Sequence, residues 1–166
     1  MNDLENVKGL AALLAAMDTL PVNVERNIAR GALRAGARLI VRRARDNVRR
    51  VSGDLARSVR VVAKRGDRRL GRIAVAVTAG DKKAYYAHMV EFGTAAHVIE
   101  SGPGKRLSFG GRFYSHVQHP GARKRPFLRP AMDAHARAAV EAAREYIRNR
   151  LALKHGLVVP GPDNEA

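Results

Sequence analysis

The sequence predicts an α+β protein, with long N-terminal helices and a C-terminal helix packed on a small antiparallel β-sheet. Apolar residues recur at helical spacing in three stretches and alternate with polar residues in two shorter ones. Aromatic residues make up only 5% of the 166 residues and Trp is absent, so small aliphatic side chains must fill most of the core. We expect an N-terminal helix within residues 1–22, the main domain at 23–156 and a loose acidic tail at 157–166.

The first two helices are predicted from their capping residues and from the residues that break them. Asp3 is a candidate N-cap of the first helix, and Pro21 is expected to end it. Asn23 is a candidate N-cap of the second helix, which should run over residues 24–50 until the chain turns at Gly53. At 1.5 Å per residue, a helix of that length would extend about 40 Å.

The C-terminal helix is expected to begin at residues 129–131, because Pro130 suits the first turn of a helix. Gly156 is a candidate C-cap for the same helix. Its expected apolar stripe consists of Met132, Ala136, Val140, Ala143, Ile147 and Leu151.

Two strands are predicted at residues 58–64 and 71–78, where apolar and polar residues alternate. The polar segment 66–69 between them is expected to be the loop of a hairpin. Each strand then has one apolar face, as in an antiparallel sheet that is covered by helices on one side.

The segment between the hairpin and the last helix is predicted to be less regular. Residues 85–92 are typical of a short helix that Gly93 terminates. Short strands are expected near residues 96–99 and 113–118, on either side of a mobile loop at 102–111.

The net charge of +16 is the most unusual property of the composition, with 31 Lys and Arg against 15 Asp and Glu. Such an excess opposes compaction, so an anionic partner is expected: nucleic acid first, an acidic protein surface second and an anionic membrane third. Cysteine is absent, and the first 20 residues carry the acids Asp3 and Glu5 where a secretory signal would carry bases. We expect synthesis in a cytoplasm and no membrane span.

The sequence offers little support for catalysis or for a cofactor. His116 and His119 lie close together but have no Cys or nearby carboxylate to complete a zinc site. The Gly-Pro-Gly-Lys run at 102–105 lacks the spacing of a phosphate-binding loop. Glu91 stands alone in an apolar stretch, where a structural ion pair is a better interpretation than a general base. We therefore predict a protein that is not an enzyme and has no cofactor.

The second helix carries an arginine at almost every fourth position. Four residues exceed the helical period of 3.6, so this row winds slowly around the helix. Only Glu25 and Asp46 are close enough in sequence to neutralise it, which leaves two interpretations: a solvated face, or a surface for another subunit, another protein or phosphate. The residues expected to contact such a polyanion or partner are Arg42, Arg43, Arg45, Arg49 and Arg50.

Three further segments form a recognisable set: Tyr86-Ala87-His88-Met89-Val90-Glu91-Phe92-Gly93-Thr94, then His119-Pro120-Gly121, then Arg125-Pro126-Phe127-Leu128-Arg129-Pro130-Ala131. Together they resemble the gene-product-ten-like family of Hong Kong-type and lambda-like siphophages, which contains neck, or tail-completion, proteins. Upstream, the run from Arg43 to Ser58 is similar to the segment of that family that contains a Thr-Gly-x-Leu motif, although the usual Ala-Pro is replaced here by residues 47–51. The resemblance covers about residues 20–152.

The motif residues are expected to maintain the fold. Gly53 and Gly93 can turn the chain where a side chain would obstruct it, and Pro126 favours an extended residue before it. Phe92 and Phe127 are expected to anchor the core between sheet and helix. The structural motif set is Gly53, Glu91, Phe92, Gly93, Thr94, Pro126, Phe127, Leu128, Arg129 and Pro130.

The resemblance implies a virion protein that forms a ring, most simply a hexamer, at the junction of head and tail. Its partners would be further copies of itself, the adjoining neck and tail proteins and, without sequence readout, the packaged DNA. Two alternatives remain open at this stage. One is a basic nucleic-acid-binding module of a host, and the other is a neighbouring neck protein such as a tail terminator.

Overall fold

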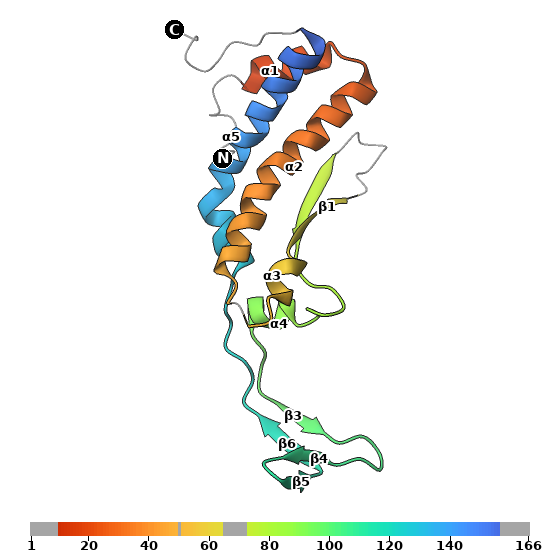
Figure 1. The fold of residues 1–166 in the computed structure, drawn as a ribbon, viewed down its shortest axis with the longest axis vertical. Helices are drawn as coiled ribbons and strands as arrows, with labels where there is room; N and C mark the ends of the chain where they lie inside the picture. Colours follow the sequence, from red (N-terminus) through yellow and green to blue (C-terminus); the bar gives the residue numbers. More distant parts are fainter. Residues whose placement is uncertain (1–9, 50, 65–72, 157–166) are drawn as a thin grey trace.

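A computed structural model describes residues 10–49, 51–64 and 73–156 of the chain. It has two parts: a helical body, and a β-stranded arm that projects from one end of the body (Figure 1). Within the body, the long helix α2 lies between the last helix, α5, and a hairpin of strands β1 and β2 (Figure 1). The α+β class is therefore confirmed, whereas the strands among the described residues form three separate two-stranded sheets rather than one sheet.

Helix α2, Val22–Asn47, is continuous over 26 residues and supports the rest of the body. It begins directly after Pro21, so the expected cap Asn23 lies inside its first turn. It also ends three residues earlier than expected, where Val48 becomes extended. The preceding helix α1, Leu10–Asp18, ends before Pro21 as expected, while its expected cap Asp3 lies outside the described residues.

Helix α5, Leu128–His155, packs along α2 over much of its length. The close approach depends on Gly36, since a Cβ at that position would overlap the backbone carbonyl oxygen of Ala139. Gly156 has φ of 65° and its N–H bonds to the carbonyl of Leu151, which confirms the expected C-cap.

Strands β1, Arg60–Lys64, and β2, Ala74–Thr78, pair in antiparallel register and pack on α2. The expected loop at 66–69 lies outside the described residues. A strand was expected from residue 58, but the chain forms a short helix there, α3, Asp54–Ser58. The Ser58 hydroxyl donates to the carbonyl of Leu55 and accepts from the N–H of Gly80, so this residue serves a buried turn and not the sheet.

The short helix α4, Ala87–Phe92, ends at Gly93 as the sequence predicted. Beyond it the chain enters the arm, residues 94–122, which contains two hairpins. Strands β3, His97–Glu100, and β6, His116–His119, form the nearer hairpin. Strands β4, Leu107–Phe109, and β5, Arg112–Tyr114, form the outer one, so part of the expected loop at 102–111 is a strand.

Two hydrophobic clusters hold the body together. One joins α1, α2 and α5 at the end far from the arm, and it contains Leu13, Met17, Ile28, Ala32, Ile147 and Leu151. The other lies at the arm end of α2, around Ala44, Val59, Ala84, Phe127 and Ala131. By contrast, no residue from Phe92 to Pro126 is buried, so the arm has no core of its own.

Candidate functional site

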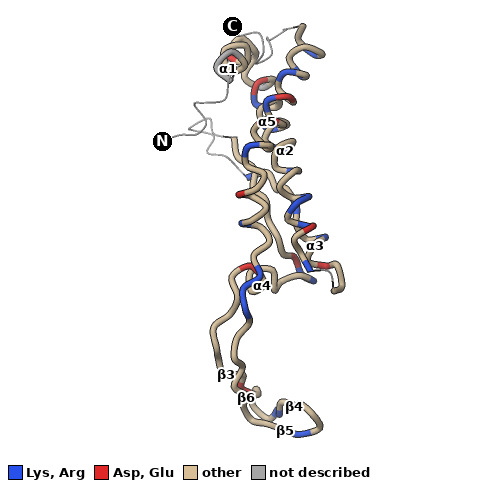
Figure 2. Tube along the Cα trace, turned by 90° about the vertical axis from the view of Figure 1, so that its left-hand side faces the viewer, with Lys and Arg blue, Asp and Glu red and all other residues tan. Residues whose placement is uncertain are grey.

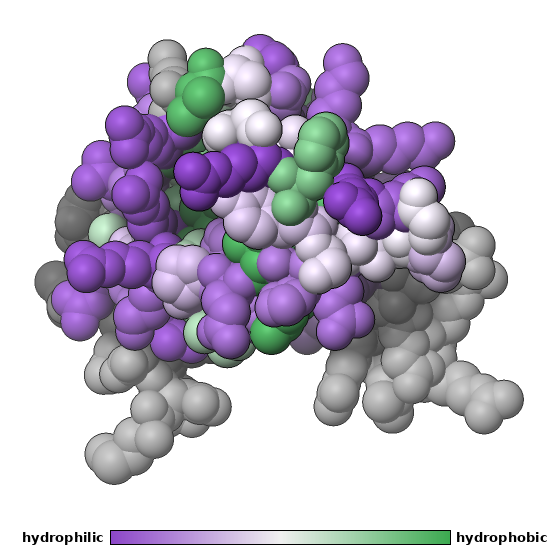
Figure 3. Space-filling view, turned by 90° about the horizontal axis from the view of Figure 1, so that it is seen from below, coloured by the Kyte–Doolittle hydropathy of each residue, from purple (hydrophilic) through white to green (hydrophobic). Residues whose placement is uncertain are grey.

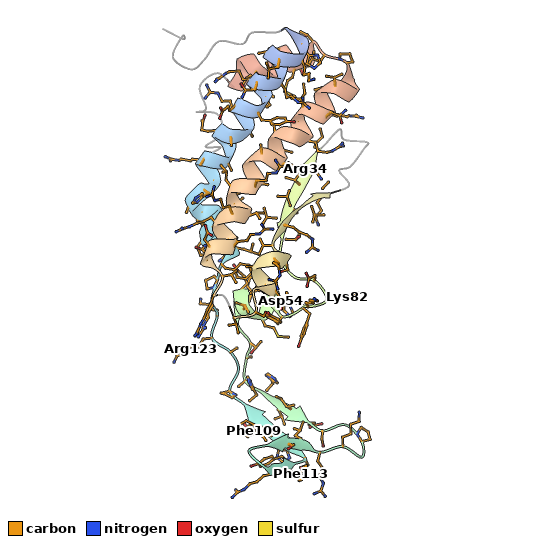
Figure 4. The ribbon with its side chains drawn as sticks, viewed as in Figure 1. Arg34, Asp54, Lys82, Phe109, Phe113 and Arg123 are labelled. Atoms are coloured by element: carbon orange, nitrogen blue, oxygen red, sulfur yellow. The ribbon has the colours of Figure 1, made fainter. Side chains whose placement is uncertain are left out.

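A basic groove runs between α2 and β1. Its volume is about 700 Å³. Figure 4 shows Arg34 on the part of α2 that lies beside β1. The lining residues are Arg34, Arg38, Val41, Arg42, Arg45, Asp46, Arg60 and Val61. Five guanidinium groups therefore share one concave surface with a single carboxylate.

Two of these arginines are fixed by the backbone. Arg45 donates from Nε and Nη2 to the carbonyl oxygen of Val59, over 3.2 and 2.8 Å. Arg60 donates from Nη1 to the carbonyl oxygens of Ser58 and Gly80, both over 2.9 Å. These bonds hold two positive charges at defined positions along the groove, and they give Arg45 a structural role that the sequence did not predict.

The positive charge of the groove is not balanced by ion pairs within the described part of the chain. The ion pairs found there join Arg57 to Asp54 and Arg144 to Glu141, and neither pair lines the groove. Basic segments recur along α2 and near the base of the arm, with few acidic segments between them (Figure 2). Unpaired arginines that share a concave surface are typical of sites that bind phosphate or carboxylate groups.

The structure brings together only part of the predicted contact set. Arg42 and Arg45 line the groove, whereas Arg43 lies about 140° around the helix from Arg38, at roughly 100° per residue. Arg49 lies beyond the end of α2, in a separate depression that also contains Gly53 and Phe127. Arg50 lies outside the described residues. Sequence reasoning missed the contribution of Arg60, because only the packing of β1 on α2 places it there.

The motif residues form a second, structural site, in which Glu91 caps α5. Its Oε2 accepts from the backbone N–H groups of Phe127 and Leu128, over 2.7 and 2.9 Å, and its Oε1 accepts from that of Arg129, over 3.0 Å. The first four N–H groups of a helix have no partner within the helix. In α5 these four positions are residues 127–130. Glu91 accepts from the first three, and the fourth is Pro130, which has no N–H group.

The expected ion pair of Glu91 is therefore replaced by bonds to backbone amides. Burial alone would raise the pKa of this carboxyl, but the three amide hydrogen bonds outweigh it and hold the pKa below its ordinary value. The charge of nearby Arg129 acts in the same direction. Glu91 thus remains an anion at neutral pH and stabilises the start of α5.

The two main motif segments, residues 86–94 and 125–131, lie close together at the base of the arm. Thr94 and Ala122 form a bridge of two backbone hydrogen bonds, and the Thr94 hydroxyl also accepts from the N–H of Ala122. Gly93 has φ of 76°, and a Cβ there would lie 2.7 Å from the carbonyl oxygen of Ala122. The motif therefore closes the arm where it leaves the body.

The two motif phenylalanines have different environments. Phe127 is 1% exposed and belongs to the core, as expected. Phe92 is 74% exposed, so the expectation that it anchors the core is wrong. The reason is the direction of α4, whose buried residues are Ala87 and Glu91, one turn apart, while Phe92 follows on the outer side.

The remaining sequence candidates lie apart from both sites. His119 accepts from the N–H of Gly121 and stacks on His97, while His116 contacts the Ser115 hydroxyl. No group of three His, Asp or Glu side chains suited to a metal ion was found in the described segments. None of the described helices is both long and apolar enough to cross a membrane.

Comparison with known proteins identifies the class. A family model matches residues 11–93, half of the chain, from α1 to Gly93. It describes a bacteriophage tail component, which is a structural rather than a catalytic class of protein. The chain belongs to this family, whose description is "Bacteriophage HK97-gp10, putative tail-component". Searches of curated proteins and of solved structures gave no significant match.

Proposed function

We propose that this tail component is a subunit of a ring in the phage neck, where it completes the tail and joins it to the DNA-filled head. Membership of the tail-component family supports a place in the tail. The proposed ring is cyclic, with six copies as the simplest expectation, and its subunits are made in the cytoplasm of the host bacterium. A closed ring requires two different contact faces on each subunit.

The observation that carries the proposal is the basic groove. Arg34, Arg38 and Arg42 are exposed along one face of α2 and have no counter-ion among the described residues. In a neck ring, this surface would meet either an acidic face of an adjoining protein or the phosphates of DNA. Either partner would also offset the self-repulsion of a subunit that carries +16.

The test removes charge from the groove without disturbing the fold. The variant Arg38→Gln/Arg42→Gln should unfold at the wild-type temperature, because exposed unpaired arginines contribute little to stability. Phage that carry it should accumulate unjoined heads and tails, which can be counted by electron microscopy. The matched control is Arg26→Gln/Arg43→Gln, which removes the same charge from exposed positions of α2 outside the groove.

The partner of the groove is identified by salt dependence. If DNA is the partner, binding weakens steeply with salt, and each lost phosphate contact flattens the log–log slope by about 0.9. If an acidic protein is the partner, free DNA binds poorly and charge reversal on that protein restores joining. Normal joining by the groove variant would contradict the proposal, and so would a neck that contains a single copy of the chain.

A further inference from the structure

A large apolar groove lies on the body, separate from the basic one. Its volume is about 850 Å³, and α2 and α5 form its floor, with β2 and α4 at its sides. The expected apolar stripe of α5 is buried at Ile147 and Leu151, half-buried at Val140 and Ala143, and exposed at Met132 and Ala136. Exposed residues that line the groove include Leu33, Phe92 and Met132. The end of this stripe that is nearer the arm, although it has core spacing, is thus left without a cover.

A buried arginine indicates what the groove receives. Arg144 lines the groove, is only 5% exposed, and has no hydrogen-bond partner for Nε or Nη2. Its Nη1 reaches Glu141 over 3.4 Å, and the Glu141 side chain is largely exposed. A buried guanidinium with unsatisfied N–H groups is unfavourable unless an acceptor is supplied. Both nitrogens lie below the surface of the subunit, so an acceptor from outside reaches them only when the Arg144 side chain turns toward the groove. An occupant that brings apolar side chains and an oxygen acceptor would favour that turn.

The arm presents a complementary surface. Phe109 is 76% and Phe113 is 67% exposed, and both lie at the end of the arm, far from the helices (Figure 4). Seen from the arm end, the molecule is mostly hydrophilic, with a few hydrophobic side chains standing among charged ones (Figure 3). Every strand of the arm is an edge strand, so carbonyl groups along it are free to accept hydrogen bonds. Glu100 is the only acid in the arm.

We propose that the tip of the arm of one copy occupies the apolar groove of the next copy. Phe109 or Phe113 would cover Leu33 and Met132, and a carbonyl oxygen of the arm would accept from Arg144 once its side chain turns toward the groove. The contact joins two different faces, so it repeats from copy to copy in one direction and can close into a ring. This inference rests on the proposed ring and specifies its subunit contact.

The chain itself contains no cysteine, so engineered thiols give a clean test. Single variants Phe109→Cys and Met132→Cys are mixed at high protein concentration in about 0.5 M salt, which screens the self-repulsion of the subunits. Mild oxidation should then yield disulfide-linked dimers that contain one chain of each variant. The control replaces Met132→Cys by Leu153→Cys, a thiol at an exposed apolar position outside the groove, and should yield few such dimers.

Other occupants of the groove give different products. Dimers of Met132→Cys with itself, in excess over the mixed dimer, would mean that two grooves face each other and would overturn the inference. If wild-type protein forms rings but no disulfide forms between the Phe109→Cys and Met132→Cys variants, only this inference fails. If particles contain no ring, the proposed function fails as well.

Arg144 provides a second, independent readout. In Arg144→Met, a similar volume remains but the unsatisfied charge is gone, so the isolated subunit should be at least as stable as the wild type. Self-association, measured by sedimentation, should nevertheless weaken by roughly tenfold or more, as when a central interface arginine is lost. The variant Phe109→Ser/Phe113→Ser should show the same loss with an unchanged unfolding temperature. A destabilised Arg144→Met subunit with normal association would contradict the inference.

Discussion

Glu91 shows how one side chain can determine where a helix begins. Glu91 lies in α4, yet its two carboxylate oxygens accept three hydrogen bonds from the amides that begin α5, 36 to 38 residues later in the chain. The same contact brings the two ends of the arm together, because Thr94 and Ala122 lie just beyond it. One charged residue thus caps a helix and fixes the base of the arm.

The Glu91→Gln variant should lose about 2–3 kcal/mol of stability at pH 7, because an amide oxygen accepts fewer and weaker hydrogen bonds than a carboxylate. The pKa of Glu91 is lowered in the folded state, so its contribution is fully present above the unfolded pKa of about 4.3. It is lost as the pH falls through the lower folded pKa. Urea unfolding at pH 7 and at low pH would show the difference between wild type and variant shrinking.

The matched control is Glu145→Gln, since Glu145 is exposed on α5. It should change stability by less than about 0.5 kcal/mol at any pH. A Glu91→Gln variant as stable as this control would mean that the cap contributes nothing.

At the scale of elements, the α2–α5 pair depends on two glycines with different neighbours. A Cβ at Gly36 would overlap the backbone of Ala139, which can move only if the helices separate. A Cβ at Gly31 would meet the ring of Tyr146 instead, and a side chain can turn aside. The two positions therefore differ in how readily the structure can adapt to a methyl group.

Gly36→Ala should lower stability by about 1–3 kcal/mol, the usual effect of overpacking, reduced by the gain of up to about 1 kcal/mol in helix propensity. Gly31→Ala has the same gain in helix propensity and should lower the stability less than Gly36→Ala does. Thermal unfolding of both variants measures the difference directly. An equal effect at both positions would show that the α2–α5 spacing is not limited by the backbone contact.

At the scale of the whole molecule, the body and the arm contribute in different ways. The body contains both hydrophobic clusters, while the arm has no buried residue and consists of two short hairpins in series. Isolated two-stranded hairpins are at best marginally stable in water. An arm of this kind is better suited to contact another surface than to stabilise its own subunit.

Removing the arm should therefore leave the body folded. Since Thr94 and Ala122 already form an antiparallel bridge, residues 95–121 can be replaced by Asn-Gly, which closes a two-residue turn. We expect an unfolding temperature within about 4 °C of the wild type, equivalent to roughly 1 kcal/mol, in calorimetry. A loss of cooperative unfolding would show instead that the arm is part of the folding unit.

The sequence by itself determined the fold class, the antiparallel pairing of β1 and β2, the C-terminal ends of α4 and α5, and the family. These features follow from local signals: the periodicity of apolar residues, capping glycines such as Gly93 and Gly156, and short motif segments such as residues 86–94 and 125–131. Tertiary structure alone decided that Glu91 caps a helix, that Arg60 joins Arg38 and Arg42 in one groove, and that Phe92 and Met132 remain outside the core. Each of these features depends on how segments that are distant in sequence meet in space. A cap or a groove needs two such segments side by side, and an apolar residue at core spacing is buried only where another element lies over it.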